Sequence, residues 1–231
     1  MTRRGRQKAP QSKPLATWNA TGANQLWSWD ITWLKSVTTG MWFYLYLLED
    51  VFSRKIVGYE VHAVESGEHA AELLQRTVLS ERCWQQPLVL HADNGAPMKS
   101  QTLRVKLAEL KITPSHSRPR VSNDNAYVES LFRTLKYAPT WPEKGFSTLE
   151  EARAWVEGFV GWYNEDHRHS GIRYVTPGQR HRGEDRQLLE QRKSLYEAAK
   201  RSNPQRWSGQ TRNWSRQEEV WLNPERETLA A

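Results

Sequence analysis

The feature that most limits the folds open to this chain is a run of eight apolar and aromatic residues from Met41 to Leu48. Gly40 precedes the run, and Glu49 and Asp50 follow it. The run is too short to cross a membrane as a helix, and it is typical of a β-strand buried on both faces. The chain is therefore expected to build a sheet with other elements packed on both sides.

Two more strands are predicted beside this one, at residues 25–34 and 54–62. Residues 25–34 alternate, so Asp30 lies in mid-strand on the face opposite a row of apolar side chains. Short connections make the three strands an antiparallel meander. The apolar row consists of Trp27, Trp29, Ile31 and Trp33.

The pattern changes after residue 65 to alternating helices and strands, which predicts an α/β sheet of about five strands. Ser147 and Glu150 are spaced as a capping box, and Thr176-Pro177 is typical of a helix start. We expect an arm at 1–24, a core at 25–183 and a helix with a Trp-containing tail at 184–231. Residues 115–123 are predicted to be a mobile loop. Helices are predicted at 66–79, 100–110, 123–137, 147–164 and 185–202, and strands at 88–91 and 111–114.

The charge of the chain indicates an anionic partner. The formal net charge is +7. Five basic and no acidic residues lie in 1–24, which suggests a flexible arm that contacts phosphate or has no role. Eight basic and three acidic residues lie in 99–136. The single cysteine, Cys83, excludes an internal disulfide, and no apolar run or leader suggests a membrane, so we expect a soluble cytoplasmic protein.

Three acidic residues are candidates for metal-dependent chemistry on DNA. Asp30 lies in a strand, Asp93 follows the strand at 88–91, and Glu129 lies within a predicted helix. Two divalent ions about 4 Å apart can cut a phosphodiester, and Mg²⁺ prefers a few carboxylate oxygens as ligands. Taken one at a time, each residue is better explained as an ordinary strand, cap or helix-surface carboxylate.

Together, these residues and their surroundings resemble a known family. There are 62 residues between Asp30 and Asp93 and 35 between Asp93 and Glu129. This spacing resembles the D,D-35-E pattern of retroviral integrases and of the bacterial insertion-sequence transposases that are made by fusing two reading frames. The matching segments are 27–32 (WSWDIT), 50–54 (DVFSR), 91–95 (HADNG), 117–125 (SRPRVSNDN), 129–136 (ESLFRTLK) and 162–169 (WYNEDHRH).

The resemblance implies a ribonuclease-H-like core, with the five predicted strands in the spatial order 3-2-1-4-5. Asp30 and Asp93 would then lie on neighbouring strands. It implies that Asp30, Asp93 and Glu129 are both the catalytic residues and the ligands of two Mg²⁺ or Mn²⁺ ions. One site would cut the ends of the element to release a 3′-OH, and would then transfer that 3′-OH to target DNA.

The resemblance also implies contacts to DNA on the helix that carries Glu129. Lys136 and Arg133 follow Glu129 at positions that contact the DNA end in integrase relatives, although a solvated basic helix face explains them as well. Asp50, in its family motif, is expected to be structural rather than a metal ligand, and residues 167–169 are expected to hold the C-terminal helix to the core. The candidate DNA contacts are Lys136, Arg133, Asn125, Arg118 and Arg120.

The expected partners are the element ends, the target DNA and further copies of the chain on paired ends. Family members usually carry a helix-turn-helix region before the catalytic part, whereas here only about 24 residues precede the first strand. A separate end-recognition subunit or domain is therefore an expected partner. The resemblance also implies that the protein associates with the nucleoid when it acts on DNA. The alternatives are a non-catalytic DNA-binding fragment that modulates a full-length transposase and a ribonuclease-H-type nuclease, which the 35-residue spacing disfavours.

Overall fold

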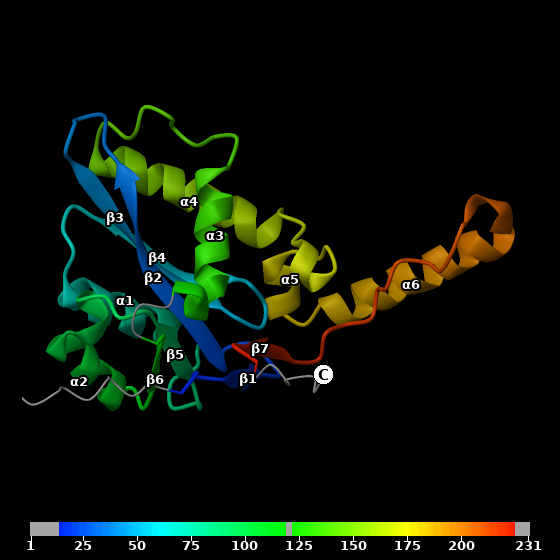
Figure 1. Cartoon of the computed structure of the whole chain (residues 1–231), viewed down its shortest axis with the longest axis horizontal. Coiled ribbons are helices and arrows are strands. Elements are labelled where there is room, and N and C mark those ends of the chain that lie inside the picture. Colours follow the sequence, from blue (N-terminus) through cyan, green and yellow to red (C-terminus); the bar gives the residue numbers. More distant parts are fainter. Residues whose placement is uncertain (1–13, 119–121, 225–231) are drawn as a thin grey trace, which may run out of the picture.

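The computed structural model of the chain describes residues 14–118 and 122–224, and its centre is a mixed five-stranded sheet (Figure 1). The strand order is β4-β3-β2-β5-β6, which confirms the predicted order and the α/β, ribonuclease-H-like fold class. Strands β2, β3 and β4 are antiparallel, and β5 and β6 run parallel to β2. The bounds are Leu26–Lys35 for β2, Trp42–Asp50 for β3, Ile56–His62 for β4, Val89–Ala92 for β5 and Thr113–His116 for β6.

Helices cover both faces of the sheet, as the buried run in β3 requires. Trp27 and Trp29 of β2 pack with α1 and α2 on one face, and Leu34 packs with α3 and α4 on the other. The predicted alternation of β2 is confirmed for Trp27, Trp29 and Ile31, which pack in the cluster with α1 and α2. Trp33, at the end of this row, is about half exposed, and Ser28 on the opposite face is buried. The helices are α1 (Gly67–Ser80), α2 (Gln101–Glu109), α3 (Ala126–Lys136), α4 (Leu149–Glu165), α5 (Pro177–His181) and α6 (Asp185–Ser202).

Side-chain caps begin most of these helices. Ser66 and Ser100 cap α1 and α2, and the predicted helix start at Thr176-Pro177 is confirmed, with Thr176 as the cap of α5. The capping box predicted at 147–150 is one residue out of register. Thr148 has an extended backbone, and its hydroxyl accepts the backbone N–H of Glu151 at 3.1 Å, so Thr148 is the cap.

A second, two-stranded sheet joins segments that are far apart in the chain. Strand β1 (Trp18–Ala20) pairs antiparallel with β7 (Val220–Leu222). Their side chains pack with Leu26 and Phe52 of the main body. The predicted flexible arm is therefore wrong for residues 18–20, which form a strand, while residues 1–13 lie outside the described part of the chain. Three residues give no periodicity from which a strand could be predicted.

Helix α6 extends away from the sheet, and the following segment returns along it (Figure 1). Tyr196 of α6 contacts the rings of Trp207 and Trp214 in that segment, with centroids 6.0 and 5.2 Å apart. The Trp-containing tail therefore packs back on α6. None of the helices among the described residues is long and apolar enough to span a membrane.

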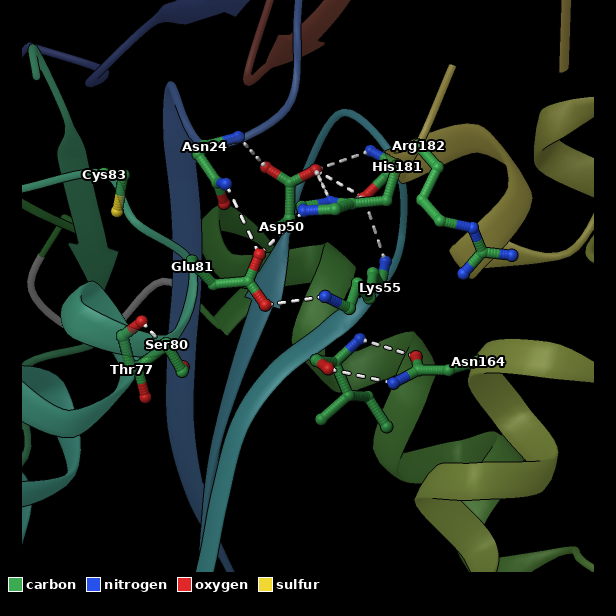
Figure 2. A network of polar contacts seen from close by, with 12 residues as sticks. Asn24, Asp50, Lys55, Thr77, Ser80, Glu81, Cys83, Asn164, His181 and Arg182 are labelled. Atoms are coloured by element: carbon green, nitrogen blue, oxygen red, sulfur yellow. Dashed lines mark hydrogen bonds and ion pairs between the residues drawn. The ribbon is translucent and has the colours of Figure 1, made fainter. Parts of the chain in front are cut away.

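A buried polar network ties the end of β3 to distant elements (Figure 2). Asp50 is fully buried, and its carboxylate accepts the backbone N–H groups of Asn24 and Ser53, both at 2.9 Å. The Ser53 hydroxyl also donates to Asp50 and lies 2.9 Å from His181 Nδ1 of α5. This arrangement fits the structural role expected for Asp50.

His181 extends the network to the end of α1. Its Nε2 atom lies 2.8 Å from Glu81, and Glu81 also pairs with Lys55 at 2.6 Å. Burial alone would lower the pKa of His181, but its hydrogen bonds to Asp50 and Glu81 outweigh burial and raise it. Burial would raise the pKa of Glu81, but the bonds from His181 and Lys55 lower it to about 2. We call this set the Asp50 network: Asn24, Asp50, Ser53, Lys55, Glu81 and His181.

Candidate active site

Two of the predicted catalytic carboxylates lie side by side because β2 and β5 are parallel neighbours. The register pairs Trp29 with Ala92, so Asp30 and Asp93 are each the next residue. Asp30 accepts the N–H of Ile31 at 2.8 Å, and Asp93 accepts the N–H of Gly95 at 2.8 Å. As predicted, the strands that carry or lead to the two residues are neighbours. Asp30 lies within β2, whereas Asp93 directly follows β5.

Helix α3 brings Glu129 to the same edge of the sheet, and Asn125 fixes the start of that helix. The Asn125 side chain accepts the hydroxyl of Ser28 at 2.5 Å and donates to the carbonyl of Trp29 at 3.2 Å. Both partners lie in β2, immediately before Asp30. The first turn of α3 is therefore attached to the strand that carries Asp30. The apolar stripe of α3 is buried against the sheet and α4: Val128, Leu131, Phe132 and Leu135.

The turn before α3 is held by further buried polar groups. His91 donates from Nε2 to the carbonyl of Asp124 at 3.0 Å, so its Nδ1 accepts from the Ser115 hydroxyl at 2.9 Å. Burial lowers the pKa of His91 to about 4, which keeps the ring neutral. Arg118 donates to both carboxylate oxygens of Asp124, at 3.0 and 2.9 Å. The helix that carries Glu129 thus starts from a fixed position.

The pKa values of Asp30 and Glu129 are raised, by burial and by nearby negative charge. Burial, followed by the charge of Asp93 and then that of Glu129, raises the pKa of Asp30 to about 7, and the charge of Lys136 opposes this. Burial and then the charge of Asp93 raise the pKa of Glu129. Among residues 14–118 and 122–224, however, no three His, Cys, Asp or Glu side chains are arranged to hold one metal ion. The carboxylates are gathered, but they do not converge on a common point.

Four of the five predicted DNA contacts are basic residues, and they fall into three groups. Arg133 and Lys136 are exposed on α3. Arg118 is partly exposed, but it pairs with Asp124. Arg120 lies outside the described residues.

The prediction that Asn125 contacts DNA is not supported. This residue is 1% exposed, and both ends of its amide bond to β2. The helix predicted at 123–137 would include Asn125, but α3 begins only at Ala126, and Asn125 lies in the preceding 3₁₀ turn, Ser122–Asn125. Asn125 therefore positions the helix.

Sequence reasoning missed Ser28, Ser115 and Asp124 as parts of the site. Ser28 and Ser115 are buried polar residues in strands, and both bond to groups that hold the start of α3. The usable signal was Ser28 within an otherwise apolar strand, two residues before Asp30 and on the same face. Nothing in the sequence marks Ser115 or Asp124 as partners of His91, because these contacts depend on the tertiary fold.

Comparison with known proteins gives consistent matches. Two family models, both described as "Integrase core domain", match residues 20–122 and 110–177. The transposase InsF for insertion sequence IS3fB of Escherichia coli is 32% identical over 162 residues, covering 69% of this chain and 54% of that protein. The transposase for element IS904 of Lactococcus lactis is 31% identical, covering 68% and 61%. The chain thus spans about half the length of the curated relatives it matches.

Solved structures support the fold. A chain from the simian T-cell lymphotropic virus intasome in complex with the PP2A regulatory subunit B56 gamma has a TM-score of 0.55 and 18% identity. That match covers 75% of this chain and 60% of the other. The catalytic domain of Mos1 mariner transposase has a TM-score of 0.50 and 14% identity, with coverages of 60% and 70%. At such low identity the likeness concerns the fold alone.

Proposed function

The chain belongs to the integrase core family, and we propose on this basis that it is the catalytic part of an insertion-sequence transposase. It would act as a polynucleotidyl transferase that cuts DNA at the ends of an element and transfers the 3′-OH to target DNA. The observation that carries the proposal is the gathering of Asp30, Asp93 and Glu129 at one edge of the sheet. No covalent intermediate with a side chain is needed for this chemistry.

The donor set of the site fits Mg²⁺ or Mn²⁺, which we propose as two ions per site. Asp30, Asp93 and Glu129 would hold them, since carboxylate oxygens are the ligands such ions prefer. The raised pKa of Asp30 reflects burial and then repulsion by Asp93 and Glu129, which a cation would relieve. A solved structure of the Mos1 catalytic domain, at TM-score 0.50, contains Mg. When bound, such ions activate the attacking oxygen and neutralise charge that develops on the phosphate.

The residues of the chain itself would bind and orient DNA. Lys136 and Arg133 are exposed cations on the helix that carries Glu129, and such groups neutralise backbone phosphates without reading sequence. Arg118 and Arg120 are proposed as further phosphate contacts. Asn125 would keep Glu129 at a fixed distance from Asp30. Several copies of the chain would assemble on paired ends, and a separate subunit or domain would recognise those ends. The protein would associate with the nucleoid when it acts.

The experiment that tests this function is a strand-transfer assay. Purified chain is incubated with a pre-cut DNA end, a supercoiled target plasmid and Mg²⁺ or Mn²⁺. We expect joined product with the wild type and none with Asp93→Asn. Glu72→Gln is the matched control, since it removes an exposed carboxylate of α1 and is expected to leave product formation unchanged.

The opposite result would be equally informative. Binding of DNA by the folded wild type, with no metal-dependent product, would contradict the proposed activity. It would instead favour a non-catalytic fragment that modulates a longer transposase. Equal product from the wild type and Asp93→Asn would remove Asp93 from the mechanism.

A further inference from the structure

A cavity of about 240 Å³ lies on a different face of α3 from Glu129. It is bounded by α3, the end of β3, the turn that follows β3, the end of α4 and the segment after α4. The volume exceeds the space that one water molecule occupies by several fold. The polar residues that line it are Glu49, Arg54, Ser130, Thr134, Tyr163 and His169.

Two side chains in this lining have polar atoms without a partner. Glu49 is 2% exposed, and its Oε2 atom has no hydrogen-bond partner among the described residues. The same holds for the Nε atom of Arg54. The two side chains influence each other electrostatically, yet they form no ion pair within 4.0 Å in the described part of the chain. Buried polar groups are normally satisfied, so these two atoms are available to hydrogen-bond a molecule held in the cavity.

The lining is rich in hydrogen-bond donors. The guanidinium of Arg54 lies over the ring of Tyr127, 3.9 Å from its centroid, which fixes its plane and leaves its edge for a ligand. His169 accepts the N–H of Gly171 at Nδ1, so the neutral ring carries its proton on Nε2. The Tyr163 side chain adds a hydroxyl. Each of these groups can donate to an oxygen atom.

The charge of the lining favours an anion. Burial raises the pKa of Glu49 to about 8, despite the opposing charge of Arg54, so the side chain is a neutral acid at neutral pH. Burial lowers the pKa of His169 to about 4, and that ring is neutral too. Arg54 therefore contributes the charge of the cavity, and the neutral Glu49 acid can act as a donor.

We propose that this cavity binds a compact oxyanion, a carboxylate or a phosphate group, between the Arg54 guanidinium and the protonated Glu49 side chain. Arg54 supplies charge-assisted hydrogen bonds, which are the strongest available for such a ligand. The ligand would contact α3 next to Ser130, the residue that follows Glu129. The site is separate from the carboxylates that bind metal in the proposed function, and its test needs neither DNA cleavage nor metal.

The test is an amide NMR titration of ¹⁵N-labelled full chain with sodium phosphate, and in a second arm with sodium acetate, at constant ionic strength. We expect saturable shifts at Arg54, Tyr127, Ser130 and His169. Arg54→Gln should weaken binding at least tenfold. Glu49→Gln should retain binding within about threefold, because glutamine keeps a donor and no charge is needed there.

A third arm uses a short DNA duplex as the source of phosphate. If the duplex shifts the same four amides and competes with free phosphate, the ligand is a backbone phosphate; if it does not, the ligand is a free anion. Absence of saturable shifts at these residues in the wild type would overturn the proposal. Loss of binding in a folded Glu49→Gln variant would also overturn it, because the site would then require an ionised Glu49. If Arg54→Gln fails to fold, the presence or absence of saturable shifts in the wild type tests the proposal.

Discussion

Two groups of carboxylates in this chain have opposite electrostatic environments. In the Asp50 network, Asp50 accepts three hydrogen bonds and Glu81 pairs with both His181 and Lys55. In the candidate active site, Asp30 accepts one backbone N–H and lies near two further negative charges. The pKa of Glu81 falls to about 2, whereas that of Asp30 rises to about 7.

The difference separates a structural role from a functional one. Carboxylates that are paired in the fold stabilise it, and their partners come from the protein itself. Carboxylates that are gathered without an ion-pair partner destabilise the fold, and a cation bound from outside would relieve their repulsion. Three substitutions or conditions test this contrast, and we take them from the largest expected effect to the smallest.

Replacing Asp30 by Asn should have the largest effect, a loss of activity without a loss of stability. Strand transfer should fall on the order of a thousandfold, because a metal ligand worth several kcal/mol is lost. The free energy of unfolding without metal should rise by about 1 kcal/mol, since repulsion with Asp93 and Glu129 is removed. The measurements are the transfer assay and urea unfolding. A variant that is both inactive and less stable would contradict the contrast.

Replacing Asp50 by Asn should do the reverse and destabilise the fold by about 3 kcal/mol. The new amide would face the N–H groups of Asn24 and Ser53, which need acceptors. Urea unfolding measures the loss. Glu72→Gln, at an exposed ion pair, should change stability by less than about 0.5 kcal/mol. Equal losses of stability in the two variants would mean that the buried Asp50 carboxylate stabilises the fold no more than the exposed Glu72 carboxylate does.

The smallest effect should be a pH dependence from His181. Its pKa is raised in the folded state, so its contribution is fully present below the unfolded value of 6.5. That contribution is lost as pH rises through the raised pKa. The stability difference between wild type and His181→Gln should therefore shrink by about 1 kcal/mol between about pH 6 and pH 9. A difference that is constant across this range would show that His181 does not ionise within the network.

Much of the fold followed from local patterns in the sequence. The run from Met41 to Leu48 required a sheet covered on both faces, and the alternation around Asp30 placed that residue on a strand. The strand order came from the family resemblance, and the structure confirms it. The predicted fifth strand was shifted by about two residues, to Thr113–His116, because Pro114 and the residues around it carry no clear alternation.

The parts of the site that were not predicted are those made by contacts across the fold. Asn125 bonds to Ser28, 97 residues away, and His181 to Ser53, 128 residues away. Neither contact has a local pattern, so no periodicity or spacing could reveal it. The cavity between Glu49 and Arg54 is of the same kind: one acidic residue at a strand end and one arginine in a turn look like solvated surface residues until helix α3 covers them.

The pairing of β1 with β7 has a consequence for the order in which the site is completed. Asn223, just after β7, donates to the carbonyl of Asp124 at 2.9 Å and thereby joins the groups that hold the first turn of α3. Ribosomes add about 5–20 residues per second, so Asn223 is synthesised roughly 5–20 seconds after Asp124. During that interval a nascent chain can assemble its sheet and bring Asp30 and Asp93 together. The contact from Asn223 to the turn before α3 forms only afterwards. The site is therefore complete only once Asn223 has been synthesised.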